Sequence, residues 1–245
     1  MIGAPAAADA VARAKALPTL RVGLHAVLVD GDPIADHAEI PGLLDRGGRL
    51  RNDLLRYSAE IAASPLIRKQ IEREITAQFE AYRLTGLPLD HVNAHRHFHL
   101  HPTVAAAIIH IGRQHGMKAL RVPFEPWRIV ADIDPGTRRL AARAVAPWAA
   151  RLLRSVRKSD LTAADAVFGL AWSGAMTKAR LAPLLGQLPA GLIEIYLHPG
   201  ASDDFAGAAP GYHYAEEFAA LCDPDCIAAA RQSGYALGGY GDVAG

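Results

Sequence analysis

Apolar and polar positions follow two periods along the chain, and the change from one to the other predicts its helices and strands. Apolar residues that recur every three or four positions predict helices at residues 6–18, 54–64, 65–86, 102–116, 137–158, 177–189 and 215–223. Short apolar runs bounded by turn residues predict strands at 20–31, 90–100, 118–125, 164–171, 192–200 and 235–243. Pro147 is expected to interrupt the long helix in which it lies.

Strands separated by helices of this size predict an α/β fold with a parallel sheet. The most economical arrangement closes that sheet into a (β/α) barrel. At 245 residues the chain is long enough for one large domain, and we expect residues 1–245 to form a single one.

The segment "DHVNAHRHFHLHP" carries histidines at every second position. If the strand runs through it, His95, His97, His99 and His101 share one face, because alternate side chains of a strand point the same way. The carboxyl end of a parallel strand is where α/β proteins place ligands, and neutral imidazole binds Zn, Fe or Ni. We expect at least one of the four to have a metal-binding or catalytic role. The alternative is a histidine-rich surface strand.

Two further predicted strands carry a histidine near one end. His25 lies in an apolar strand that ends in a Gly, Asp and Pro turn, and His198 precedes Pro199 and Gly200. Taken alone, His25 could be a packed core residue. In the strand at 192–200, Glu194 and His198 share a face. Since a barrel assembles its site from several strand ends, the three histidine-bearing strands predict one common site.

Composition narrows the classes of function. A formal net charge of +1 argues against an extended nucleic-acid surface, so no nucleic acid is expected as a partner. Cys222 and Cys226 have no companion pair and are expected to be free thiols. The chain contains no run of 18 apolar residues and no recognisable signal peptide, which predicts a cytoplasmic protein.

Residues 138–158 combine seven basic residues with several large apolar ones and no acidic residue. This composition suits an interfacial helix, which would place the protein peripherally at the inner membrane. It equally suits a barrel helix with an apolar inner face and a basic outer face.

Four motifs in order along the chain resemble the YdjC/ChbG-like carbohydrate deacetylases. They are "VGLHAVLVDGDP", "HVNAHRHFHLHP", "LIEIYLHPG" and "GYALGGYGDV". Leu170–Thr177, "LAWSGAMT", is similar to the HpnK group of that family, which is associated with hopanoid biosynthesis. The resemblance implies a TIM-like or NodB-like deacetylase barrel.

The resemblance also implies a site that binds one divalent metal ion, Mg or Zn, through two histidines and an aspartate. The histidines correspond to His25 and His95. His97, His99 and His101 would line the substrate site or support the ligands, with His97 deepest. His198 would protonate the leaving amine.

The chain departs from the family pattern in two places. Asn93 stands where relatives carry an aspartate, so it can orient a neighbour by hydrogen bonding but supplies no charge. The family's Asp-Asp-Phe-Gly strand, which carries a metal ligand and the general base, is absent from the sequence. We expect a piece of about 35 residues, comprising the first strand and helix, to be missing upstream. A start codon assigned too late would explain this, and a shortened, inactive relative is the alternative.

The implied reaction is the hydrolytic removal of an acetyl group from an N-acetylglucosamine-bearing substrate. Resemblance to the HpnK group implies N-acetylglucosaminyl bacteriohopanetetrol, a glycosylated hopanoid, or another N-acetylated sugar. Arg121 and Glu194 are candidate sugar contacts, and a structural pairing of Arg121 is equally open. A homodimer is an open alternative to a monomer. Two other classes stay open: a different metal-dependent amidohydrolase, and a non-catalytic sugar or lipid binder.

Overall fold

The computed structural model describes residues 1–137 and 139–243; the side chains of residues 139–144 lie outside this description. Its internal contacts group the chain into two compact units. Unit 1 comprises Met1–Arg121, Arg151–Ala163 and residues 238–243, and unit 2 comprises Val122–Ala150 and Ala164–Leu237. The single domain expected from the sequence stays a prediction.

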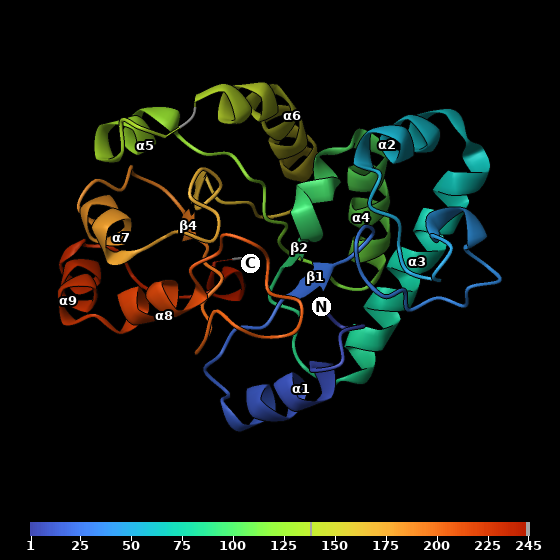
Figure 1. Cartoon of the computed structure of the whole chain (residues 1–245), viewed down its shortest axis with the longest axis horizontal. Helices are drawn as coiled ribbons and strands as arrows, with labels where there is room; N and C mark the ends of the chain where they lie inside the picture. The colour runs from blue at the N-terminus through green and yellow to red at the C-terminus, as the bar shows by residue number, and fades with distance from the viewer. Residues whose placement is uncertain (138, 244–245) are drawn as a thin grey trace. The chain divides into compact units, whose positions relative to one another are not determined.

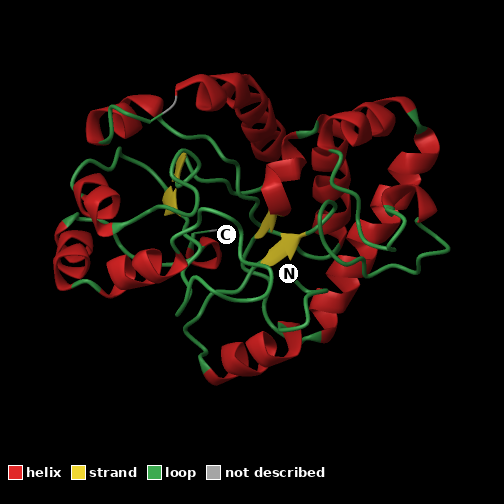
Figure 2. Cartoon of the chain, viewed as in Figure 1, coloured by secondary structure: helices red, strands yellow, loops and turns green. Residues whose placement is uncertain are grey.

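In both units far more residues lie in helices than in strands, and the strands are short (Figures 1 and 2). Unit 1 contains α1 (Ala7–Ala16), β1 (Leu24–Ala26), α2 (Leu54–Ala63), α3 (Pro65–Leu84), β2 (Val92–Ala94) and α4 (Pro102–Gln114). It also holds three 3-10 helices, Pro41–Leu43, His95–Leu100 and Tyr240–Asp242. Unit 2 contains α5 (Trp127–Ile133), β3 (Ala166–Phe168), α7 (Lys178–Leu185), β4 (Ile193–Ile195), α8 (Tyr214–Cys222) and α9 (Pro224–Gln232). The long helix α6 (Arg139–Lys158) contributes to both.

The predicted helices are confirmed where local signals mark their ends. Ser64 caps α3, its hydroxyl accepting the Ile67 N–H at 3.3 Å, and Pro65 opens the helix. Gly86 and Gly116 follow α3 and α4 in the left-handed region, with φ of +74° and +77°. Two helices were missed, α5 and α9. At the start of α9, Asp223 accepts the N–H groups of Asp225 and Cys226. The Asp-Pro pair at its start was a signal that could have found it.

The strands form two parallel pairs. In unit 1, β1 pairs with β2, with His25 opposite Asn93, and single bridges join Val92 to Leu120 and Ala119 to Thr162. In unit 2, β3 pairs with β4. Parallel pairs joined through helices confirm the α/β class. The described sheets are small and unclosed, so the barrel stays a prediction, and residues 118–125 contribute bridges in place of the strand expected there.

Strand β1 ends at Ala26, and at the next residue a side chain takes the place of a neighbouring strand. The Gln78 amide accepts the Val27 N–H at 2.9 Å and donates to the Val27 carbonyl at 2.5 Å. With both of its main-chain groups bound to Gln78, Val27 has none left for a further strand on that edge. The strand expected over residues 20–31 is limited to three residues.

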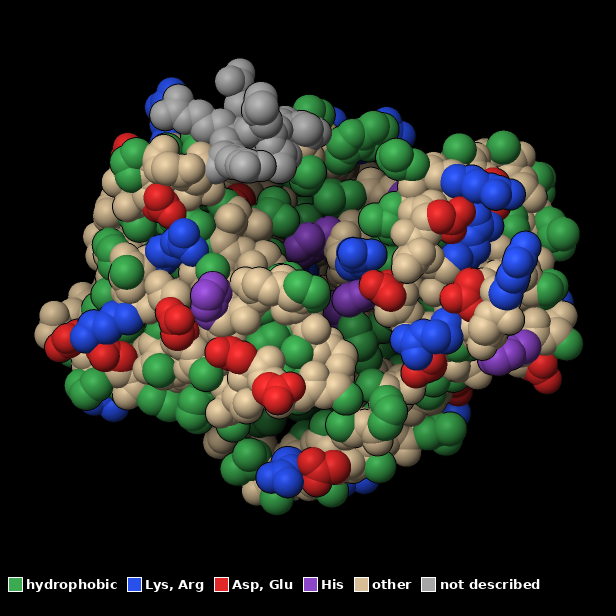
Figure 3. All heavy atoms as spheres, in the orientation of Figure 1, with side chains coloured by type: hydrophobic (Ala, Val, Ile, Leu, Met, Phe, Trp, Pro, Cys, Tyr) green, Lys and Arg blue, Asp and Glu red, His purple; other side chains and the backbone are tan. Residues whose placement is uncertain are grey.

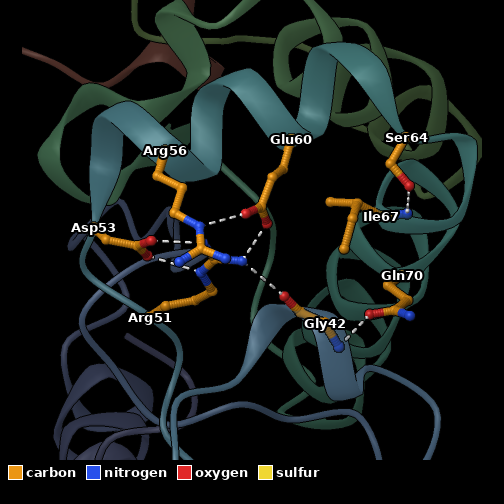
Figure 4. A network of polar contacts seen from close by, with 8 residues as sticks. All are labelled: Gly42, Arg51, Asp53, Arg56, Glu60, Ser64, Ile67 and Gln70. Carbon is orange, nitrogen blue, oxygen red and sulfur yellow. Dashed lines mark hydrogen bonds and ion pairs between the residues drawn. The ribbon is translucent and has the colours of Figure 1, made fainter.

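Gln78 belongs to a row of three buried polar side chains on α3, spaced four residues apart. Gln70 accepts the Gly42 N–H at 2.8 Å, as Figure 4 shows beside the Arg51 ion pairs with Asp53 and Glu60. Glu74, fully buried, accepts the N–H groups of Ile34 and Ala35. The row holds the segment after β1 at three points. Buried polar groups are tolerated there because each is hydrogen-bonded.

The strand expected at residues 235–243 is wrong. Carboxylates satisfy the backbone of this segment instead of a neighbouring strand. Asp90 accepts the N–H groups of Tyr240 and Gly241, and Asp242 accepts that of Gly239. With its donors bound to side chains, the segment forms the short 3-10 helix Tyr240–Asp242.

Helix α6 continues through Pro147, so the interruption expected there is wrong. Ala149, Leu152 and Val156 are buried, whereas Arg151 and Arg154 are exposed. This pattern favours a helix that packs with an apolar inner face. Residue 138 and the side chains of 139–144 lie outside the described residues, and the membrane contact predicted for 138–158 stays a prediction.

None of the helices within residues 1–137 and 139–243 is both long and apolar enough to span a bilayer. The cysteines are free, as expected, with Cys222 exposed and Cys226 buried. On the face drawn in Figure 3, acidic and basic side chains are interspersed, in keeping with the formal net charge of +1.

Candidate functional site

His25 and Asn93 lie side by side because β1 and β2 are paired in that register. Residues opposite each other in neighbouring strands project to the same face of the sheet. The imidazole Nδ1 of His25 lies 2.5 Å from the Asn93 Oδ1. Since an amide oxygen only accepts, Nδ1 carries the proton and Nε2 presents its lone pair. Asn93 therefore has the orienting role predicted for it.

His95 lies next to that lone pair. Its Nδ1 is 3.4 Å from the His25 Nε2, and the two rings are inclined at 73°. Burial lowers the pKa of His25 to about 3, so its ring is neutral at neutral pH. A neutral imidazole with an oriented lone pair is the form that binds a metal ion.

The spacing of the two nitrogens fits a pair of ligands on one ion. Two imidazole nitrogens at the usual distance from a tetrahedral zinc ion would lie about 3.3 Å apart. Within residues 1–137 and 139–243, however, no group of three or more His, Cys, Asp or Glu side chains is placed to hold a metal. The described residues thus bring two imidazole nitrogens together, with no third side chain of these types placed to join them.

The histidines at every second position from His95 to His101 do not lie on a strand in the structure. β2 ends at Ala94, and Arg96 and His97 adopt left-handed conformations, with φ of +52° and +53°, inside the 3-10 helix His95–Leu100. A period of two places side chains on one face only while the backbone stays extended. Here the chain turns before α4 begins at Pro102, so the shared face predicted for the four histidines is wrong.

The later histidines have separate surroundings. His99 is fully buried, and its Nε2 donates to the Arg121 carbonyl at 2.9 Å. Burial lowers its pKa to about 4. His101 caps α4, its Nδ1 accepting the Thr103 N–H at 3.3 Å. The His97 and His99 rings lie 6.2 Å apart. These contacts favour a supporting role for His99 and His101, and the substrate contacts of His97, His99 and Arg121 stay predictions.

His198 lies in unit 2, three residues beyond the end of β4. Its ring contacts those of Tyr196 and Tyr212, with centroids 5.7 Å and 5.1 Å away. Its main-chain N–H donates to the carboxylate of Glu217. Because β4 ends at Ile195, the regular strand face predicted for Glu194 and His198 does not reach His198. The structure thus brings His25, Asn93 and His95 together in unit 1 and places His198 in unit 2.

Sequence reasoning missed the residues that hold His198. Glu217 is fully buried, and Tyr212 binds Ser173 through a hydroxyl contact of 3.0 Å. Glu217 lies in the first turn of α8, where an acidic residue is usually explained by the helix dipole. No pattern in the sequence distinguishes it from its exposed neighbour Glu216.

The sequence model of the family described as YdjC-like protein matches residues 1–232. The chain belongs to this family. The YdjC-like chain is 28% identical over 240 residues to a carbohydrate deacetylase of Geobacillus stearothermophilus, covering 97% of this chain and 82% of the relative.

A second relative, a carbohydrate deacetylase of Brevibacillus brevis, is 36% identical over 119 residues, which are 48% of this chain and 43% of the relative. The crystal structure of a candidate cellobiose-phosphate cleavage protein from Enterococcus faecalis V583 superimposes with a TM-score of 0.75 at 18% identity. That superposition covers 100% of the YdjC-like chain and 86% of the other. At this identity the likeness concerns the fold alone.

Proposed function

We propose that this YdjC-like chain is a metal-dependent carbohydrate N-deacetylase that removes the acetyl group from an N-acetylglucosamine-bearing substrate. The observation that carries the proposal is the pair of nitrogens of His25 and His95, 3.4 Å apart, with His25 neutral and oriented by Asn93. Family membership supports it, since the relatives from Geobacillus stearothermophilus and Brevibacillus brevis are named carbohydrate deacetylases.

In this proposal His25 and His95 hold one divalent ion, Mg or Zn. Such an ion supplies polarisation of the acetyl carbonyl and a lowered pKa of bound water. Asn93 accepts the Nδ1–H group of His25, which leaves the lone pair on Nε2 at the opposite side of the ring. The ring can therefore bind an ion without rearrangement. The Asp-Asp-Phe-Gly motif is absent from the sequence, and we assign the general base to no residue of this chain.

In this proposal His198 protonates the leaving nitrogen. A water oxygen forms the new C–O bond to the acetyl carbon, and the water gives up a proton to a base. As the C–N bond breaks, a protonated His198 donates to the sugar nitrogen, which departs as a neutral amine. Acetate and the free glucosaminyl compound are the products.

For the substrate we propose a glycosylated hopanoid, N-acetylglucosaminyl bacteriohopanetetrol. The resemblance of Leu170–Thr177 to the HpnK group supports it. The candidate sugar contacts are His97, His99, Arg121 and Glu194. We also propose that the parallel strand pairs belong to a (β/α) barrel, which the alternation of strands and helices along the chain supports.

Acetate release from an N-acetylglucosaminyl hopanoid and from an N-acetylglucosamine disaccharide would test the activity and the substrate together. Two proteins are assayed: the chain as it stands, and a longer chain that carries the family's Asp-Asp-Phe-Gly segment upstream. We expect His95→Ala to abolish acetate release in any active chain. His110→Ala, at an exposed position on α4, is the matched control and should leave the rate unchanged. Acetate release by His95→Ala at the rate of the parent would contradict the proposal.

Zinc binding by calorimetry gives a readout that does not depend on activity. We expect His25→Ala and His95→Ala each to weaken binding about tenfold or more relative to His110→Ala. Equal affinity in all three variants would remove the metal site from the proposal.

A second candidate is a non-catalytic sugar or lipid binder. The observation that favours it is the lack of a third ligand near His25 and His95 within residues 1–137 and 139–243. Such a binder would retain the disaccharide or the hopanoid in equilibrium dialysis while releasing no acetate, even with the upstream segment present. Release of acetate by either chain would exclude it.

A further inference from the structure

Glu217 is a fully buried carboxylate that joins two loops of unit 2. It lies on α8, and one oxygen accepts the Met176 N–H at 2.8 Å while the other accepts the N–H of His198. An ionised carboxylate is costly to bury unless strong donors surround it, and backbone N–H groups are such donors. Its two hydrogen bonds therefore hold both loops in one arrangement.

The hydrogen bond from His198 to Glu217 lies beyond the point where β4 is paired with β3. The last ladder contact of this strand is the Tyr196 N–H to the Phe168 carbonyl, at 3.0 Å. Beyond it, the main chain of His198 is tied to α8 through Glu217. The carboxylate thus continues the support that the pairing of β3 and β4 provides up to that point.

The bond to Met176 fixes the loop that contacts Tyr212, a ring neighbour of His198. Within this loop, the Gly174 carbonyl accepts the His213 N–H at 2.7 Å, and the Ser173 hydroxyl lies 3.0 Å from that of Tyr212. The Tyr212 ring in turn lies edge-on to the His198 ring, 5.1 Å between centroids. One carboxylate therefore places both the main chain of His198 and the loop behind its aromatic neighbour.

We propose that Glu217 is the positioning residue of His198, fixing the direction in which the imidazole is presented to the substrate's leaving nitrogen. The catalytic part of this inference rests on the proposed function. The positional part rests on the two hydrogen bonds and the ring contact. A misplacement of about 1 Å at a reacting group can lower a rate about 10²-fold, so loss of the two Glu217 hydrogen bonds should have a measurable effect on turnover.

Unit 2 offers a matched control. The carboxylate of Glu125 accepts the N–H groups of Gly169, Leu170 and Ala171 at 2.9–3.0 Å, close in sequence to the loop that Glu217 holds. It makes the same kind of bond, a carboxylate to loop N–H groups, but does not bond to His198. Glu125→Gln and Glu217→Gln make the same exchange of a carboxyl group for an amide with almost no change of size, so a difference between their effects reports the bond to His198.

The first measurement is steady-state kinetics on acetate release. For Glu217→Gln we expect kcat to fall about 10- to 100-fold with KM changed less than about threefold, because alignment in the transition state is lost and substrate binding is kept. Glu125→Gln should keep kcat within about threefold. Equal losses of kcat in the two variants would overturn the proposal, since they would report general loosening of the loops.

The second measurement does not need activity. In the ¹³C-labelled protein, we expect the ring signals of His198 to shift in Glu217→Gln and to keep their positions in Glu125→Gln. Unchanged ring signals in a folded Glu217→Gln protein would overturn the positional claim. If the parent protein releases no acetate with or without the upstream segment, the proposed function fails while this measurement still decides the role of Glu217.

Glu217→Asp keeps the charge but shortens the reach by one methylene, and it serves if the Gln variant does not fold. A shift of the His198 ring signals in this variant, without one in Glu125→Asp, is the expected result. If the His198 ring signals coincide in the Glu217→Asp protein and its parent, Glu217 does not position His198.

Discussion

Glu74 in unit 1 and Glu217 in unit 2 make the same kind of hydrogen bond, but they hold different parts of the chain. Both carboxylates lie on helices, both are fully buried, and both accept main-chain N–H groups from a segment that follows a strand. Glu74 bonds to Ile34 and Ala35, well beyond His25 in the chain. Glu217 bonds to His198 itself.

The difference follows from where each histidine lies relative to its strand. His25 lies within β1, so pairing with β2 and the Asn93 hydrogen bond already orient it. His198 lies beyond β4 and depends on a side chain from α8. Loss of Glu74 should therefore appear chiefly as lost stability, and loss of Glu217 as lost alignment.

The largest effect on stability is expected from Glu74→Ala. The substitution leaves the N–H groups of Ile34 and Ala35 and one N–H of the Gln78 amide without their acceptor. Each unsatisfied buried donor costs roughly 1–3 kcal/mol, so the free energy of unfolding should fall by about 3 kcal/mol or more. Urea unfolding measures it, with the exposed Glu72→Ala on the same helix as control. A loss no greater than that of the control would show that Glu74 does not hold the segment.

A pH effect of similar size is expected from His99 in unit 1. Burial lowers its pKa from 6.5 to about 4, so the unfolded chain takes up a proton at higher pH than the folded one. Its contribution to stability is therefore complete above about pH 6.5 and is lost as the pH falls toward 4, by an amount on the order of 3 kcal/mol.

His99→Gln removes this titration. We expect its unfolding free energy to change less between pH 7 and pH 4.5 than that of the parent, as measured by urea unfolding at each pH. His110→Gln, at an exposed position, should follow the parent. Parallel pH profiles for His99→Gln and its parent would contradict the expected linkage.

Two glycines with almost the same backbone conformation allow the cost of backbone strain to be distinguished from the cost of steric crowding. Gly174 in unit 2 and Gly86 in unit 1 have φ of +75° and +74°. A Cβ on Gly174 would lie 2.2 Å from the Tyr212 ring, whereas one on Gly86 would meet nothing within 4 Å. Gly86→Ala should cost about 1 kcal/mol from strain alone, and Gly174→Ala about 2–3 kcal/mol.

Thermal unfolding of the two alanine variants would measure this difference. The His198 ring signals provide a second readout, because only Gly174→Ala displaces Tyr212. Equal costs in the two variants would mean that the Tyr212 ring moves aside freely and does not border His198 tightly.

The smallest effects are expected at two helix starts. Asp223 accepts two N–H groups at the start of α9, and Ser64 accepts one at the start of α3. Asp223→Ala should cost about 1–2 kcal/mol and Ser64→Ala about 0.5–1 kcal/mol. Urea unfolding of both variants checks the order. A larger loss for Ser64→Ala would show that the number of N–H groups bound does not set the strength of these caps.

Helix ends and histidine positions differ in how far the sequence alone could predict them. Pro65, Pro102, Gly86 and Gly116 mark helix ends through effects confined to a single turn, and the structure confirms them. The alternation of histidines was also a local pattern. It misled because Arg96 and His97 leave the extended conformation, and no turn residue in the sequence announces this.

The buried polar residues were outside the reach of such patterns. Gln70, Glu74 and Gln78 follow the spacing of a solvated helix face, and Glu217 resembles an ordinary first-turn acid. Their roles depend on main-chain groups of segments 19 or more positions away along the chain.

The sequence by itself determined the α/β class, most helix boundaries, the family, and His25, His95 and His198 as candidates. Only the tertiary structure decided that the His25 lone pair faces His95, that His99 is buried against the Arg121 carbonyl, and that a carboxylate on α8 holds His198. The physical reason is range. Caps, turns and periodicity act within a few residues, whereas the orientation of a site depends on hydrogen bonds between segments that meet only when the chain is folded.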